Sequence, residues 1–122
     1  MVFLNENSNL KKRTKADAII TGQKKLPIAV LTADCVPVLL YDYEKKIIAA
    51  IHAGWKGAYK GIIKNVINFM LKKGCNPKNI IGAIGPSITQ KNYEVKDDLK
   101  KKFIKKHKKN KIFFKNKKKL IY

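Results

Sequence analysis

The stretch VPVLLYDYEKKIIAAIH, residues 36–52, contains two apolar runs on either side of a short charged segment. The runs Val36–Tyr41 and Ile47–His52 are rich in valine, leucine and isoleucine, whereas Asp42–Lys46 has the polarity of a turn. This pattern predicts two buried, neighbouring strands joined as a hairpin. Because each run is continuously apolar and does not alternate, we expect both faces of the sheet to be covered.

Further helices and strands are indicated on both sides of the hairpin. Apolar residues recur at helical spacing from residue 58 to 71, and Gly74, followed by Pro77, is typical of a helix end. Asp97–Lys109 predicts a very basic helix. Shorter apolar segments predict a helix or edge strand at Ala16–Thr21 and strands at Ile28–Thr32, Ile80–Ile84 and Ile112–Phe114. Alternating strands and helices indicate a mixed α/β fold.

The length of 122 residues fits one domain, and no apolar run approaches the length needed to span a bilayer. The first residues lack a basic segment followed by a long apolar core, so no signal peptide is expected. The two cysteines, Cys35 and Cys75, are few for a secreted domain and ordinary as free thiols. We therefore expect a soluble cytoplasmic protein with no membrane partner.

The chain has 28 Lys+Arg against 8 Asp+Glu, which gives a net charge of +20. Such a charge is common in proteins that bind nucleic acids. However, Arg13 is the only arginine, and nucleic-acid surfaces normally use arginine for bidentate contacts. The lysines accompany abundant isoleucine and asparagine, a pattern typical of A+T-rich coding sequence. We expect a solvated lysine surface that binds RNA nonspecifically, with no specific nucleic-acid partner.

Two residues with metal-binding side chains lie at interrupted strands. Cys35 lies between Asp34 and Pro37, which are poor residues for a strand interior and indicate a local break. His52 ends its apolar run just before the glycine-bounded segment Gly54–Gly57. A thiolate and an imidazole on neighbouring strands are suitable zinc ligands or catalytic groups. A catalytic zinc site has three protein ligands, and the chain offers two.

Other chemically notable side chains have simpler interpretations. His107 lies inside the run Lys105–Lys109, where cations disfavour a metal ion, so we expect a solvated surface residue. Cys75 follows a helix end, where the partial negative charge opposes thiolate formation, so we expect it to pack in the core. Trp55, the only tryptophan, is either a core residue or a platform that stacks on a planar ligand.

Four segments in this order resemble the laccase-domain family, also called the multicopper polyphenol oxidoreductase or purine nucleoside phosphorylase family. The likeness extends from about Lys15 to Phe103. The segments are Lys15–Thr21, Leu31–Val38, Ala49–Gly57, and Ala83–Ile88 with Tyr93–Val95.

The resemblance implies a mixed α+β fold, a mixed sheet flanked by helices like that of the cytotoxic-necrotising-factor-type cysteine hydrolases. It implies a zinc centre of two histidines and a cysteine, in which Cys35 and His52 are metal ligands and catalytic residues; copper is the older family assignment. It also implies phosphorolysis of adenosine, inosine and S-methyl-5'-thioadenosine, with adenosine deamination as a further activity. Trp55 and Lys56 are the substrate-binding residues expected for the nucleoside and phosphate.

The chain departs from the family pattern in several places. Lys56 replaces a usual arginine, which keeps the charge and loses bidentate anion binding, and Ser87 replaces a common cysteine. The family's first histidine is expected just before Met1, and its C-terminal portion beyond Tyr122. We therefore expect residues 1–122 to be a single incomplete domain with uncovered apolar strand faces, and a partner chain to supply the missing histidine. The alternatives are an inactive fragment of such an enzyme and a lysine-rich nucleic-acid-binding protein.

Overall fold

The structure, a computed structural model, describes residues 1–9 and 15–115. The chain separates into two compact units, Met1–Ser87 and Ile88–Tyr122. The expectation of one incomplete domain over residues 1–122 stays a prediction. Within the described residues, no helix is both long enough and apolar enough to cross a membrane.

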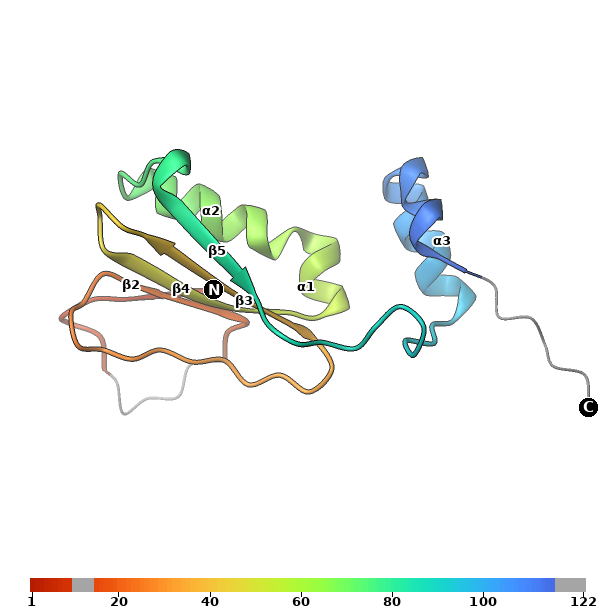
Figure 1. Ribbon diagram of the computed structural model, residues 1–122, viewed down its shortest axis with the longest axis horizontal. Coiled ribbons are helices and arrows are strands. Elements are labelled where there is room, and N and C mark those ends of the chain that lie inside the picture. The colour runs from red at the N-terminus through yellow and green to blue at the C-terminus, as the bar shows by residue number, and fades with distance from the viewer. Residues whose placement is uncertain (10–14, 116–122) are drawn as a thin grey trace, which may run out of the picture. The chain divides into compact units, whose positions relative to one another are not determined.

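The strands of the first unit are β1 Val2–Leu4, β2 Ala18–Thr21, β3 Val36–Asp42, β4 Ile47–Ala53 and β5 Ile80–Ile84. They form one mixed sheet with the order β1-β2-β4-β3-β5 (Figure 1). β1 pairs parallel with β2, and the other neighbours are antiparallel. β3 and β4 form the predicted hairpin, in a register that pairs Val36 with Ala53 and Asp42 with Ile47.

Asp42 organises the turn between β3 and β4. Its Oδ1 accepts the backbone N–H groups of Glu44 at 3.0 Å and Lys45 at 2.7 Å, and its Oδ2 accepts that of Asn76 at 3.2 Å. The side chain is fully buried. These hydrogen bonds hold the pKa of Asp42 below its ordinary value, and the one from the Lys45 N–H has the largest effect. Burial, followed by the nearby Asp42 charge, raises the pKa of the Cys75 thiol to about 11.

The helical elements of the first unit are α1 Trp55–Lys60, α2 Ile62–Lys72 and the short 3-10 helix η1 Pro77–Asn79. The expectation of one continuous helix after the hairpin is wrong, because Gly61 adopts a left-handed conformation with φ of 76°. The Gly61 N–H donates to Ala58 O at 3.0 Å, and the Asn65 N–H donates to Gly61 O at 3.0 Å. α1 therefore ends and α2 begins at this glycine. Gly74 has φ of 87°, as predicted for the position that stops the second helix.

Substituting Gly61 with alanine is expected to destabilise the first unit by about 1 kcal/mol, because a Cβ is disfavoured at positive φ. An added Cβ at this position meets nothing within 4 Å, so the loss comes from the backbone alone. Urea unfolding of Gly61→Ala and Gly61→Asn tests this, since asparagine tolerates the left-handed region better. A Gly61→Ala protein as stable as the parent would mean that the two helices are continuous in solution.

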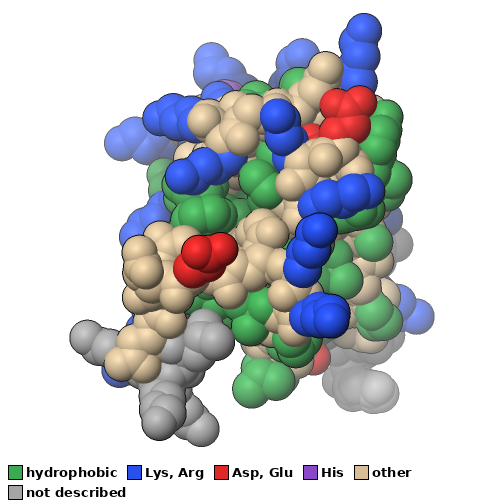
Figure 2. Space-filling model, turned by 90° about the vertical axis from the view of Figure 1, so that its left-hand side faces the viewer, with side chains coloured by type: hydrophobic (Ala, Val, Ile, Leu, Met, Phe, Trp, Pro, Cys, Tyr) green, Lys and Arg blue, Asp and Glu red, His purple; other side chains and the backbone are tan. Residues whose placement is uncertain are grey.

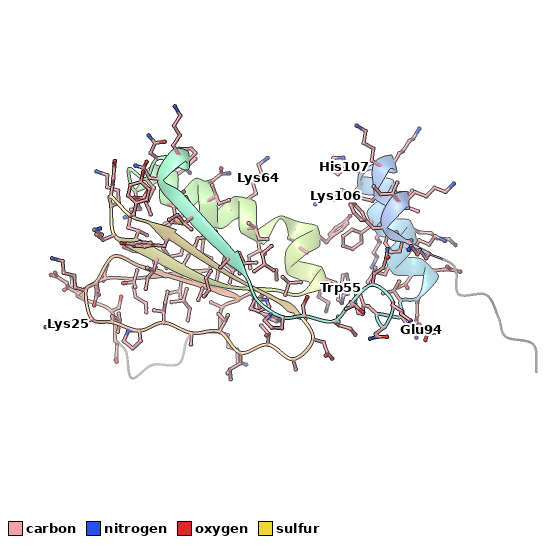
Figure 3. The ribbon with its side chains drawn as sticks, viewed as in Figure 1. Lys25, Trp55, Lys64, Glu94, Lys106 and His107 are labelled. Atoms are coloured by element: carbon pink, nitrogen blue, oxygen red, sulfur yellow. The ribbon has the colours of Figure 1, made fainter. Side chains whose placement is uncertain are left out.

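The core lies between the sheet and α2, both of which contribute apolar side chains. Figure 1 shows α1 and α2 on the same side of the sheet. Val66 and Met70 on α2 are fully buried, whereas Lys64 points away from the sheet (Figure 3). Cys75 is buried, as predicted. The buried core cluster consists of Ala18, Ile20, Val38, Leu40, Ile47, Ala49, Ile51, Val66, Met70 and Cys75.

The opposite face of the sheet is not covered by any helix of the first unit. Leu39 on β3 is 55% exposed and Ile81 on β5 is 60% exposed. Within the first unit, the expectation that both faces are covered is therefore wrong, and the expectation of an uncovered apolar strand face is confirmed. Ile28–Thr32 forms no strand. β3 lies between β4 and β5, and β4 lies between β2 and β3, so both edges of each strand are already paired. This segment therefore cannot add to either strand.

The second unit contains α3 Asp97–Lys106 and the 3-10 helix η2 Lys108–Phe113. α3 confirms the predicted basic helix, although it ends three residues earlier than expected. The prediction of a strand at Ile112–Phe114 is wrong, because η2 covers most of it. The ring centroids of Phe103 and Phe114 lie 6.3 Å apart in an edge contact, and Asn110 Nδ2 donates to Phe103 O at 2.8 Å. These contacts fold the segment back onto α3.

Candidate metal centre

Cys35 lies at the break that the sequence predicts, immediately before β3. Asp34 has φ of 72°, in the left-handed region, and regular strand structure begins only at Val36. The Cys35 side chain is half-buried and forms no disulfide. The bend therefore gives the thiol a position at the end of the sheet, outside the regular alternation of β3.

His52 lies on β4, one residue before the end of the strand, opposite Pro37 in the β3–β4 register. Its Nε2 and the Sγ of Cys35 approach the same point. A Cβ placed on Gly54 would lie 3.3 Å from Cys35 Sγ and 3.4 Å from His52 Nε2. The structure thus brings together the two residues predicted as metal ligands, and glycine at position 54 leaves the space between them and the backbone open.

A carboxylate that the sequence reasoning did not single out lies on the other side of the imidazole. His52 Nδ1 is 3.1 Å from Asp17 Oδ1, and the His52 backbone N–H donates to Asp17 O at 2.7 Å. Asp17 directly precedes β2, which pairs with β4. A carboxylate at Nδ1 favours the tautomer with its hydrogen on Nδ1, which leaves the Nε2 lone pair facing Cys35. The only sequence signal for Asp17 was its place in the first of the four family-like segments.

The two expected substrate-binding residues follow the site directly in sequence. Trp55 and Lys56 are the first two residues of α1, directly after Gly54. Figure 3 labels Trp55 at this end of the helix. The Trp55 side chain is 37% exposed, and Lys56 Nζ lies 5.6 Å from the centre of its ring, in a cation–π contact. An aromatic plane and a cation therefore stand at the start of α1, directly after Gly54 in the chain. The core and ligand-stacking interpretations of Trp55 both stay open at this exposure.

The remaining histidine and cysteine lie elsewhere. His107 is exposed in the second unit, as expected for a surface residue, and Cys75 is buried beside Asp42. Within residues 1–9 and 15–115, no group of three or more histidine, cysteine, aspartate or glutamate side chains is placed to hold a metal ion. The described residues thus provide two adjacent donor atoms and no complete set of three.

The fold and the ordered segments define a class of protein. Residues 2–121 match the family described as multi-copper polyphenol oxidoreductase laccase, and the chain belongs to this family. A purine nucleoside phosphorylase of Rickettsia conorii is 46% identical over 112 residues, which are 92% of this chain and 46% of the relative. An adenosine deaminase from an unknown prokaryotic organism is 42% identical over 91 residues, which are 75% of this chain and 35% of the relative.

Solved structures support the same fold. A crystal structure of a Neisseria meningitidis protein superposes with a TM-score of 0.78 and 32% identity, and the match covers 90% of this chain and 44% of that one. The Bacillus licheniformis hypothetical protein YfiH gives a TM-score of 0.68 with 37% identity over 70% of this chain and 33% of that one. The mixed α+β fold is therefore confirmed. The chain spans about half the length of the Rickettsia conorii relative and of the Neisseria meningitidis protein, and about a third of the adenosine deaminase and of YfiH.

Proposed function

We propose that this chain provides metal-binding and substrate-binding residues of a zinc-dependent purine nucleoside phosphorylase. Its proposed substrates are adenosine, inosine and S-methyl-5'-thioadenosine, with adenosine deamination as a further activity. The observation that carries the proposal is the convergence of Cys35 Sγ and His52 Nε2 beside Gly54. Family membership and the names of the relatives support a nucleoside-processing role. The free cysteines support a cytoplasmic location.

Zinc fits the donor pair. Thiolate sulfur and imidazole nitrogen are typical zinc ligands, and both donor atoms lie within 3.4 Å of one point. Copper, which the family description names, is the alternative metal, because a soft thiolate also suits Cu(I). A third ligand would come from outside the described residues, and a partner chain is the proposed source. When bound, the metal ion would supply Lewis-acid polarisation at the site.

The chain's own residues have distinct proposed roles. In phosphorolysis, phosphate attacks C1′ of the ribose while the bond to the base nitrogen breaks, and the base leaves with the electron pair and takes up a proton. Trp55 would stack on the purine plane, and Lys56 would attract the phosphate anion. Asp17 would hold the His52 ring so that Nε2 keeps its direction. These residues would orient the two reactants for in-line attack.

An inactive family member is the second candidate, and the incomplete donor set favours it. The test is phosphate-dependent release of adenine from adenosine, measured by chromatography with added zinc. The chain alone is expected to turn over slowly or not at all. A form extended to the full length of the relatives is expected to release adenine only when phosphate is present. No turnover by the extended form with any of the three nucleosides would exclude the proposed activity.

Removing the carboxylate at position 17 is expected to lower the affinity for zinc by about tenfold, because outer-shell partners of metal-binding histidines typically contribute 10–100-fold. Asp17 is 64% exposed, which places the effect at the lower end. Competition titrations against a chromophoric chelator would compare Asp17→Ala and Asp17→Asn with Glu6→Gln, a change of an exposed carboxylate away from the site. Equal zinc affinity in Asp17→Ala and the parent would remove Asp17 from the site.

A further inference from the structure

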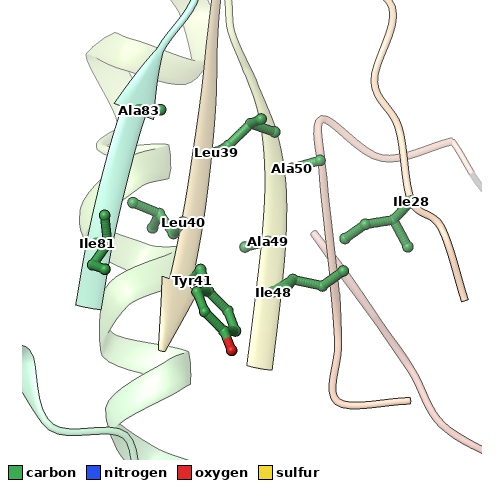
Figure 4. Close-up of a pocket in the computed structure, with 9 residues that line it drawn as sticks. All are labelled: Ile28, Leu39, Leu40, Tyr41, Ile48, Ala49, Ala50, Ile81 and Ala83. Carbon is green, nitrogen blue, oxygen red and sulfur yellow. The ribbon is translucent and has the colours of Figure 1, made fainter. Parts of the chain in front are cut away.

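His52 belongs to a row of three residues that runs across β4, β3 and the end of β5. Pro37 on β3 is its register partner. Val38 pairs with Ile84, so Gly85, directly after β5, stands opposite Pro37 on the other side. Because successive strand residues alternate between the two faces of a sheet, every second residue along these strands repeats the arrangement. Figure 4 shows two such rows further along the same face, Leu39 with Ala50 and Ala83, and Tyr41 with Ile48 and Ile81.

The backbone hydrogen bonds of this row bring Pro37 close to His52. The His52 N–H donates to Asp17 O at 2.7 Å, and the Gly85 N–H donates to Pro37 O at 3.0 Å. His52 therefore directs its backbone toward β2, Pro37 directs its own toward β5, and the two form a non-hydrogen-bonded pair. Pairs of this kind have Cα atoms about 4.5 Å apart and bring their side chains closest together. The pairing thus places the Pro37 ring next to the imidazole.

Gly85 leaves the space in which the Pro37 ring lies. A Cβ built on Gly85 would stand 2.8 Å from Pro37 Cγ, which is too close for two carbon atoms. The proline ring is stiff, and the hydrogen bond from the Gly85 N–H ties the two backbones together. An added methyl group would therefore push the ring by roughly 0.7 Å, toward His52 on its other side.

A shift of this size is large for a metal site, whose ligands must be held within about 0.5 Å of the working geometry. Cys35 Sγ and His52 Nε2 lie 3.3 and 3.4 Å from the same point beside Gly54. Pro37 adjoins both donors, because it pairs with His52 across the sheet and follows Cys35 by two residues. Asp17 holds the imidazole at Nδ1 from β2, whereas Pro37 is placed to confine it from β3.

We propose that Pro37 is a positioning residue of the candidate metal centre. Its ring sets the place of the His52 imidazole, and Gly85 provides the room that the ring needs. Asp17 acts on the imidazole through a hydrogen bond, whereas Pro37 acts through packing alone. The consequence for zinc rests on the proposed function, but the position of the imidazole does not.

A double-mutant cycle on zinc affinity tests the proposal. Gly85→Ala and Pro37→Ala are each expected to bind zinc about tenfold more weakly than the parent, the scale on which residues that support metal ligands act. In the Pro37→Ala background, Gly85→Ala is expected to have no further effect, because the two Cβ atoms would lie 3.8 Å apart. The control Gly82→Ala crowds only the end of the Leu40 side chain and is expected to bind like the parent.

The charge of the chain keeps the background of this titration low. The sequence has 28 Lys+Arg against 8 Asp+Glu. Figure 2 shows lysine side chains at many points of one surface and few acidic ones. Because surface cations repel Zn²⁺, adventitious binding to exposed carboxylates is weak. A tenfold change at the candidate centre is therefore measurable.

A second readout needs no metal and separates this proposal from the proposed function. The chain has two histidines, so the ring signals of His52 and His107 can be followed by ¹H–¹³C NMR of the zinc-free protein. Gly85→Ala and Pro37→Ala are each expected to move the His52 signals and to leave those of His107 unchanged. Gly82→Ala is expected to move neither. If the parent bound no zinc and the His52 signals still responded in this way, the proposed function would fail and the positioning role would stand.

Two outcomes would overturn the proposal. Unchanged His52 ring signals in Pro37→Ala would show that the proline ring does not confine the imidazole. This variant only removes atoms, so it is expected to fold even if Gly85→Ala does not, and circular dichroism checks both. An equal loss of zinc affinity on Gly85→Ala in the parent and in Pro37→Ala would show that the methyl group acts on the end of β5 and not through Pro37.

Discussion

Replacing Cys35 with serine is expected to lower the affinity of the chain for zinc by at least about 100-fold, because it removes the only thiolate from a two-donor site. The fold is expected to persist, since Cys35 is half-buried and lies at a bend outside the regular strand. Cobalt provides the optical signal: the parent should show thiolate-to-cobalt charge transfer that the variant lacks. Circular dichroism of both proteins confirms that the variant is folded.

Two further substitutions make this result specific. His52→Ala is expected to lower zinc affinity and to keep a weak thiolate–cobalt signal, because Cys35 is still present. His107→Ala removes an exposed imidazole of the second unit and is expected to leave both readouts unchanged. If Cys35→Ser bound as much zinc as the parent, the metal would lie elsewhere, and the pair beside Gly54 would be a packing arrangement.

The substitution Asp42→Ala is expected to cause the largest loss of stability, lowering Tm by roughly 10 °C or more. Three backbone N–H groups around a buried carboxylate would lose their acceptor at once. Asp42→Asn keeps the shape of the side chain. However, its amide NH₂ group would face at least one of the three backbone N–H groups, which would then lack an acceptor. The control is Glu44→Gln, which changes an exposed carboxylate in the same turn and should leave Tm unchanged. Calorimetry at neutral pH measures all three variants.

The same carboxylate predicts a pH dependence. Hydrogen bonds lower the pKa of Asp42 below 3.8 in the folded state, so the ionised form stabilises the fold. This contribution is complete above the unfolded-state pKa and is lost as the pH falls through the lower folded-state pKa. The difference in Tm between the parent and Asp42→Asn should therefore narrow as the pH is lowered below about 4. A difference that stayed constant down to acid unfolding would show that Asp42 does not titrate in this way.

The parts of the fold that rest on local pattern could be predicted from the sequence. The hairpin follows from two apolar runs around a charged turn, and the end of α2 follows from Gly74. The break at Gly61 could not be predicted, because glycine is also tolerated inside helices and the apolar spacing continues past it. β1 was missed because three residues gain strand structure only by pairing with β2, a contact distant in sequence.

The two candidate metal ligands could be predicted from the sequence, but the carboxylate that contacts His52 could not. Cys35 and His52 stand at visible interruptions of apolar runs, so residue type and position indicated them. Asp17 reaches His52 only because β2 and β4 are neighbours in the sheet, 35 positions apart along the chain. The sequence also could not show that the helices of the first unit cover only one face of the sheet. An apolar strand has the same composition whether its second face packs against a helix or against another polypeptide.

X-ray absorption at the zinc edge of the zinc-loaded chain tests the central claim, that Cys35 and His52 hold one metal ion between them. The account predicts one sulfur neighbour at about 2.3 Å and imidazole scattering with nitrogen at about 2.0 Å. In Cys35→Ser the sulfur neighbour should disappear, and in His52→Ala the imidazole signal should weaken. A spectrum of the parent with nitrogen and oxygen neighbours only, or a sulfur neighbour that persists in Cys35→Ser, would contradict it.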